Sequence, residues 1–153
     1  MPVQISGNNI VVPGQALISG PPTSVEHAFR LGDAVFRRAI GRDFDMNAAA
    51  PTDVGTITIP TGKWEPWACL ACNSTANLSI AQIGVYTAAG GGGVNLVALT
   101  VLASLTGANM SQVLAIATPG QLTATTLYVR LNTAAGVAGT IDMVFVCVEL
   151  ADL

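Results

Sequence analysis

The feature that most constrains this 153-residue chain is a long stretch without charge: no Asp, Glu, Lys or Arg occurs between Glu65 and Arg130. Gly, Asn, Ser, Thr and Pro divide the stretch into short apolar runs. A membrane-spanning helix needs about 20 predominantly apolar residues in a row. The best candidate, Val94 to Leu105, is interrupted by polar residues and ends before Gly107. The pattern therefore predicts short strands and no membrane span.

The charge balance narrows the possible partners. Six Lys and Arg residues stand against nine Asp and Glu residues, and the isoelectric point is near 4.7. A nucleic-acid-binding protein needs a basic stripe to neutralise phosphates, and none is present. Exposed charge normally keeps a surface solvated and monomeric, so few charges predict that much of the exterior contacts other protein. The N-terminus lacks the basic start and apolar core of a secretory signal, so we expect synthesis in a cytoplasm.

Residues 1–55 hold most of the charge, and we expect them to form an extended arm and one helix. The arm, Met1 to Pro22, is rich in Pro and Gly, and within it Asn9 to Val12 are expected to pair with a sheet edge. A helix is predicted from Thr23 to Ile40, because Thr23 and Glu26 match a capping box and Gly41 follows the last apolar residue.

The predicted helix is amphipathic. Its apolar residues recur at spacings of three and four, which places them on one face. This face packs either on the helix's own domain or on a neighbouring subunit. The residues that we expect at such an interface are Val25, Phe29, Phe36 and Ile40.

Residues 56–153 are predicted to form an all-β body. Short strands separated by turn residues, without helical crossovers, indicate an antiparallel β-sandwich or jelly roll. The predicted strands are Thr56–Ile59, Lys63–Cys72, Asn77–Tyr86, Asn95–Ser104, Gln112–Ala117, Thr126–Asn132 and Thr140–Leu150.

The last predicted strand is apolar on both faces, which predicts burial on both faces. Ile141, Met143, Phe145 and Cys147 alternate on one side. The other side carries Val144, Val146 and Val148, which we add to the expected assembly interface.

Three cysteines, Cys69, Cys72 and Cys147, leave several states open. They pack as buried thiols, which behave as small hydrophobes, or form a disulfide within or between subunits after leaving a reducing cytoplasm. Zinc needs four Cys or His ligands, for which only His27 remains as the fourth. We expect no metal.

Other motifs for chemistry are weak. Asp43, Asp45 and Asn47 match the opening of a calcium loop, but Ala48 and Val54 stand where its Gly and Glu are needed. The sequence therefore predicts a turn there.

Catalysis and cofactor binding have little basis in the sequence. The glycines Gly90–Gly93 lie between strands without a following Lys and predict a hairpin loop, not a phosphate site. His27 is the only histidine and lies on the predicted helix. We expect no enzyme activity and no cofactor.

Trp64 and Trp67 lie close together in the sequence. They are candidates for stacking on a glycan, although aromatic residues of a small sandwich more often lie in its core or an interface.

Three segments, Ile83–Gly91, Leu127–Gly136 and Gly139–Val146, resemble small virion proteins of tailed bacteriophages. The resemblance covers roughly residues 55–150 and is carried by Ala, Gly and Thr-rich strand and loop patterns. It implies a jelly-roll structural protein of the virion that decorates or cements a capsid, often as a trimer. The implied partners are further copies of the chain and the major capsid or other virion proteins.

The leading hypothesis is therefore a non-enzymatic virion subunit, made in the host cytoplasm. It would attach through its arm, helix and charge-poor sheet faces. The alternatives are a host-surface glycan-binding module and a structural subunit at the virion neck or tail.

Overall fold

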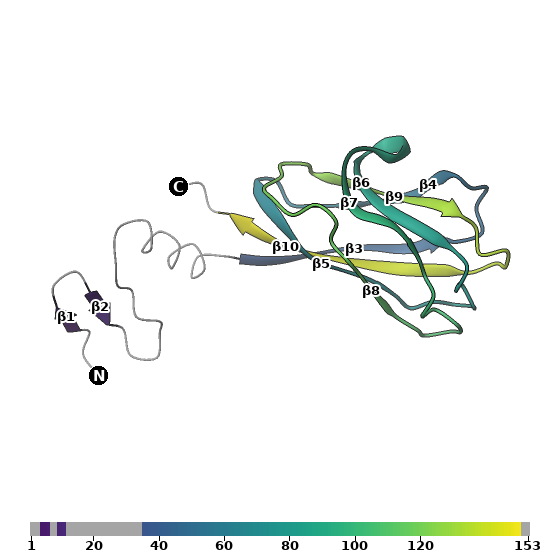
Figure 1. Ribbon diagram of the computed structural model, residues 1–153, viewed down its shortest axis with the longest axis horizontal. Helices are drawn as coiled ribbons and strands as arrows, with labels where there is room; N and C mark the ends of the chain where they lie inside the picture. The colour runs from purple at the N-terminus through teal and green to yellow at the C-terminus, as the bar shows by residue number, and fades with distance from the viewer. Residues whose placement is uncertain (1–3, 7–8, 12–34, 151–153) are drawn as a thin grey trace. The chain divides into compact units, whose positions relative to one another are not determined.

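The computed structural model describes residues 4–6, 9–11 and 35–150 (Figure 1). It divides into two compact units, Met1–Val35 with Leu150–Leu153, and Phe36–Glu149. In the first unit, β1 (Gln4–Ser6) pairs antiparallel with β2 (Asn9–Val11). The segment expected to pair with a sheet edge thus pairs within a two-stranded hairpin.

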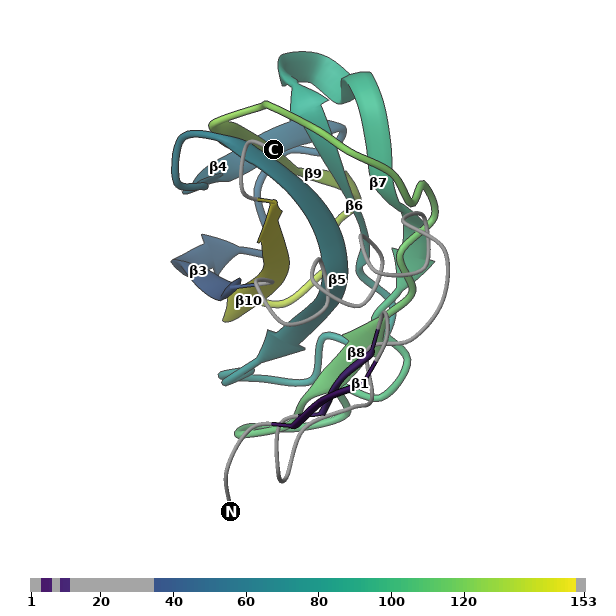
Figure 2. The same cartoon turned by 90° about the vertical axis from the view of Figure 1, so that its left-hand side faces the viewer.

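The second unit consists of two antiparallel four-stranded sheets, with strand orders β3-β10-β5-β8 and β4-β9-β6-β7. Figure 2 shows the two sheets facing each other in a view along the strands. The described residues contain one short 3-10 turn and no α-helix. The elements are β3 (Val35–Asp45), β4 (Thr52–Thr58), β5 (Lys63–Cys72), β6 (Gln82–Ala88), η1 (Ala89–Gly91), β7 (Gly92–Val101), β8 (Gln112–Leu114), β9 (Thr126–Thr133) and β10 (Thr140–Leu150).

The pairing of these eight strands is nested. The first pairs with the last, the second with the seventh, the third with the sixth, and the two middle strands form a hairpin. The glycines Gly90–Gly93 connect that hairpin, β6 to β7, as the sequence predicts. Gly90, Gly91 and Gly93 have φ between 70° and 80°, which glycine adopts without steric cost.

The core lies between the sheets and is built by strand alternation. Leu127, Val129 and Leu131 of β9 are fully buried, as their period of two predicts. The inward residues of β10 are buried as well, and its Phe145 packs edge to face on Trp64 with ring centroids 5.8 Å apart. The Trp64 indole N–H donates to the Ala124 carbonyl at 2.8 Å, so the one polar atom of this ring is satisfied.

The prediction of a helix from Thr23 to Ile40 is wrong where it can be compared with the structure. Residues 23–34, with Val25, His27 and Phe29, lie outside the described residues, but 35–40 belong to strand β3. Ala39 and Gly41 face the core, and because their side chains are small they give little period-two hydrophobic signal. The apolar residues on the outward side were therefore read with helical spacing.

The β-sandwich also begins earlier than residue 56, where we placed the start of the β body. Strands β3 and β4 lie in different sheets, and the compact unit starts at Phe36. Two predicted strands, Lys63–Cys72 and Thr140–Leu150, coincide with β5 and β10. The strand predicted from Asn77 begins at Gln82, because a turn occupies the residues before it.

Candidate functional site

The two sheets differ in the chemistry of their outward faces. On the β4-β9-β6-β7 sheet, polar groups bond to one another. Arg130 lies 3.4 Å from the carboxylate of Asp53, which also accepts the Gly90 backbone N–H at 2.7 Å. The Asn132 amide donates to Gln82 at 2.7 Å. We call this the polar face, although Leu99 and Val101 of its strand β7 are also exposed.

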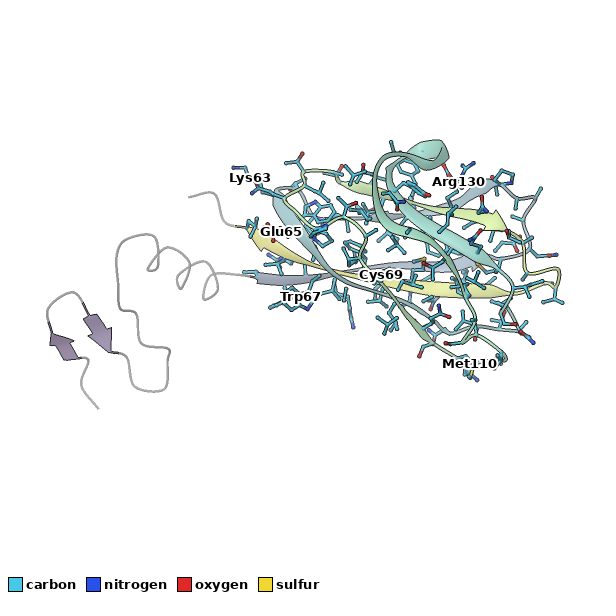
Figure 3. The ribbon with its side chains drawn as sticks, viewed as in Figure 1. Lys63, Glu65, Trp67, Cys69, Met110 and Arg130 are labelled. Atoms are coloured by element: carbon cyan, nitrogen blue, oxygen red, sulfur yellow. The ribbon has the colours of Figure 1, made fainter. Side chains whose placement is uncertain are left out.

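The outward face of the β3-β10-β5-β8 sheet is apolar, and we call it the apolar face. Most of its residues neighbour a buried, inward-facing residue along their strand, so alternation places them on the outer side. Phe36 and Trp67 have no buried strand neighbour and are assigned to this face by their exposure and their ring contact. Trp67 of this face and Arg130 of the polar face lie on opposite sides of the sandwich in Figure 3. The apolar face consists of Phe36, Ile40, Trp67, Leu70, Val113, Val144, Val146 and Val148.

Two aromatic rings form the most exposed cluster of this face. Phe36 is 58% exposed and Trp67 is 65% exposed, and their rings meet edge to face with centroids 5.4 Å apart. They come from β3 and β5, which flank β10, so the pair lies over β10. Val148, outward on β10, is 9% exposed, as expected beneath such a pair. Val113 on β8 extends the face and is 74% exposed.

Five of the seven residues predicted for an assembly interface meet on this one face. Phe36 and Ile40 reach it from β3, although the sequence placed them on a helix. Val144, Val146 and Val148 reach it from β10. Val25 and Phe29 lie outside the described residues.

The pair of tryptophans predicted to contact a glycan is split between the core and the surface. Trp64 is 2% exposed and its indole is fully engaged inside the sandwich, so its ring is inaccessible to a ligand. Trp67 lies on the apolar face. Sequence reasoning missed Leu70 and Val113. Along β5 the inward phase changes between Trp64 and Cys69, which hides the outward series.

A charged network closes one end of the apolar face. Asp142 of β10 accepts the Asn73 amide at 2.8 Å and the Asp43 backbone N–H at 3.0 Å, and Arg42 lies 3.5 Å away. The Asn73 hydrogen bond, and then the Asp43 N–H, lower the pKa of Asp142. The network fixes the β3 backbone at Asp43, where φ is 54°, to the strand beside it.

The three cysteines are free thiols. Burial raises the pKa of Cys69 to about 12. The pKa values of Cys72 and Cys147 are also raised, first by burial and then by the nearby carboxylates Asp142 and Glu149. A raised pKa disfavours the thiolate that acts as nucleophile or metal ligand.

The structure brings no metal ligands together in its described part, where no group of three His, Cys, Asp or Glu side chains gathers. Asp45, predicted to lie in a turn, accepts the Asn47 backbone N–H at 2.8 Å, while Asp43 donates its backbone N–H to Asp142. The described residues include no helix long and apolar enough to cross a membrane.

The arrangement suits contact with another macromolecule, because it is a sheet face of apolar side chains with an exposed aromatic pair. Comparison with protein families, with curated proteins and with solved structures gives no match for this chain.

Proposed function

We propose that this protein is a non-enzymatic structural subunit of a larger protein assembly and that the apolar face is one of its contact surfaces. The observation that carries the proposal is the exposed Phe36–Trp67 pair, set among valines on one sheet face. At the exposed fractions above, the two rings alone present roughly 250 Å² of surface. Burying it is worth roughly 6 kcal/mol before the cost of association. Large exposed aromatic residues of this kind mark interaction sites.

We interpret the fold as a jelly roll. In support, the eight strands pair in the nested order of two interleaved Greek keys, first with last and inward to the central hairpin. Jelly rolls occur in viral capsid proteins and in lectins. This interpretation therefore favours the structural role and keeps a carbohydrate-binding role as its rival.

The proposed assembly is a phage virion. The resemblance of three segments to small virion proteins of tailed phages supports this location, with decoration or cementing of a capsid as the leading role. The expected partners are the major capsid protein or other virion proteins and further copies of this chain, which the resemblance places in trimers. Structural roles at the neck or tail belong to the same proposal.

Absence of catalysis is also part of the proposal. The described residues include no histidine, and their three thiols have raised pKa values, so general bases and nucleophiles are scarce.

Fractionation of producing cells tests the proposal. A lysate is separated on a density gradient, and the chain is followed with an antibody alongside the particle band. A structural subunit sediments with intact particles and moves to the top of the gradient when they are disrupted. Recovery of the chain only among soluble proteins, while particles are abundant, would refute the virion role.

A glycan-binding module is the second candidate, and one observation favours it: the exposed indole of Trp67 offers a face on which a sugar ring could stack. A glycan array with the full-length protein separates the two. Binding that Trp67→Ala abolishes would favour the module, and an array without signal would favour the structural role.

A further inference from the structure

We infer that the apolar face packs against the same face of a second copy of this chain in a two-fold contact. This inference rests on the proposed function, because it takes the face to be an assembly contact and names its occupant. It differs from the trimer that the resemblance implies, since a contact between identical faces closes as a dimer.

The size of the face fits such a contact. The edge strand β3 and its neighbour β10 are each 11 residues long. With about 3.3 Å per residue and about 4.8 Å between strands, the four strands cover a flat footprint of roughly 600 Å². Stable protein contacts bury about 800 Å² of accessible surface per partner. Side chains make an accessible surface larger than its flat footprint, so the face is large enough to serve as a complete interface.

The charges at its rim point to a second copy and not to a partner of one charge sign. Arg38 on β3 and Glu65 on β5 are exposed, and no ion pair links either within the described part of the chain. Arg38 shares its outward side with Phe36, and Glu65 follows the inward-facing Trp64. This end of the rim thus carries charges of both signs on the two strands that flank β10, with Arg38 on β3 and Glu65 beside Lys63 on β5.

Both charges lie at the same end of the sheet. Arg37 and Trp64, their chain neighbours, line one shallow hollow together with Glu149 of β10. Arg37 also pairs with Glu149 at 2.6 Å, which fixes the register of β3 at this end.

A two-fold axis parallel to β10 follows from this placement. Such an axis lays β3 of one copy over β5 of the other, at the same height along the strands. Arg38 of each copy then lies at the same end of the contact as Glu65 of the other, and the Phe36–Trp67 pairs meet beside them. One symmetry operation thus brings Arg38 and Glu65 near a charge of opposite sign, which gives the contact its specificity.

Charge exchange in the full-length protein tests the inference by sedimentation velocity over a dilution series. Arg38→Glu and Glu65→Arg are each expected to raise the dissociation constant about tenfold or more, because each replaces two attractions per dimer by two repulsions. The double variant R38E/E65R is expected to restore association to within about threefold of the wild type. Thr56→Glu, an exposed change on β4 in the other sheet, is the matched control and leaves the constant unchanged.

An equimolar mixture of R38E and E65R is the decisive sample. In a two-fold contact the mixed dimer sets the two introduced side chains, which have opposite charge, against each other at one rim. At the other rim it retains the native attraction between Arg38 and Glu65. The mixed dimer therefore forms more tightly than either variant forms a dimer alone. Trp67→Ser weakens association in every background, since it removes the central anchor.

The other outcomes overturn the inference. A concentration-independent trimer unaffected by R38E would overturn the two-fold contact and leave the proposed structural function standing. A monomer at every concentration would also overturn it and would point to residues 12–34 of the same chain, or to another virion protein, as the occupant. Failure of the proposed function shows separately, as absence of the chain from particles in the gradient.

Discussion

The two tryptophans permit a sharp test, because they differ by three positions in sequence and lie in opposite environments. Trp64 is 2% exposed, packs on Phe145 and donates its indole N–H to Ala124 at 2.8 Å. Trp67 is 65% exposed. Replacing each by Phe keeps an aromatic ring at both positions and removes the indole nitrogen and the second ring.

The expected cost follows from these contacts. Trp64→Phe leaves the Ala124 carbonyl without its donor, which costs about 1–3 kcal/mol, and opens a cavity of part of a ring, worth about 1–2 kcal/mol more. We therefore expect a loss of roughly 2–4 kcal/mol in the free energy of unfolding. Trp67→Phe is expected to change it by less than about 0.5 kcal/mol, as for most surface substitutions.

Urea unfolding followed by circular dichroism measures both values. The protein concentration is kept below the range of self-association, because association would add to apparent stability. Equal destabilisation by the two substitutions, or a Trp64→Phe variant as stable as the wild type, would refute the placement of the two rings. Self-association is expected to show the reverse order, with only the Trp67 variant weakened.

Three further predictions rest on single contacts. Gly93→Ala is expected to lower the free energy of unfolding by about 2 kcal/mol or more, because φ is +70° and the new methyl group collides with a neighbouring threonine hydroxyl. Thermal unfolding measures this loss, and Gly107→Ala is the control because the space around Gly107 is open. The lowered pKa of Asp142 stabilises the fold above the unfolded value near pH 4, and this contribution is lost as the pH falls through the folded pKa. The stability of Asp142→Asn should therefore fall less steeply between about pH 5 and pH 2, and parallel curves would contradict the role of the network. With iodoacetamide at about pH 8, peptide mapping should find Cys72 labelled in the native protein while Cys69 reacts only after unfolding, and equal labelling rates would show that Cys69 is not buried.

Strand alternation was the dependable signal in this chain. β9 and β10 were both predicted as strands, because Leu127, Val129 and Leu131, and the large inward residues of β10, recur with period two. Such a pattern survives in any β-sandwich, since burial of one face requires it. The glycine hairpin between β6 and β7 was predicted for a similar local reason.

Strand β3 shows where local patterns mislead. Thr23, Glu26 and Gly41 resemble the start and end signals of a helix, and Phe36 and Ile40 lie four residues apart. A spacing of four residues places side chains on one side of a helix and also on one side of a strand, so it cannot by itself separate the two. Pairing with β10 decides the matter for the described residues, and that partner lies about 100 residues later in the chain.

The amino-acid sequence by itself determined an all-β, charge-poor body, because turn residues and period-two hydrophobicity are local properties that each segment carries alone. Only the tertiary structure decided that Trp64 is buried while Trp67 is exposed. It also decided that Phe36 from β3 and Trp67 from β5 meet across β10. Which strands become neighbours depends on packing between segments far apart in the chain. For that reason the apolar face, assembled from four separate strands, could be recognised residue by residue in the sequence but not as one surface.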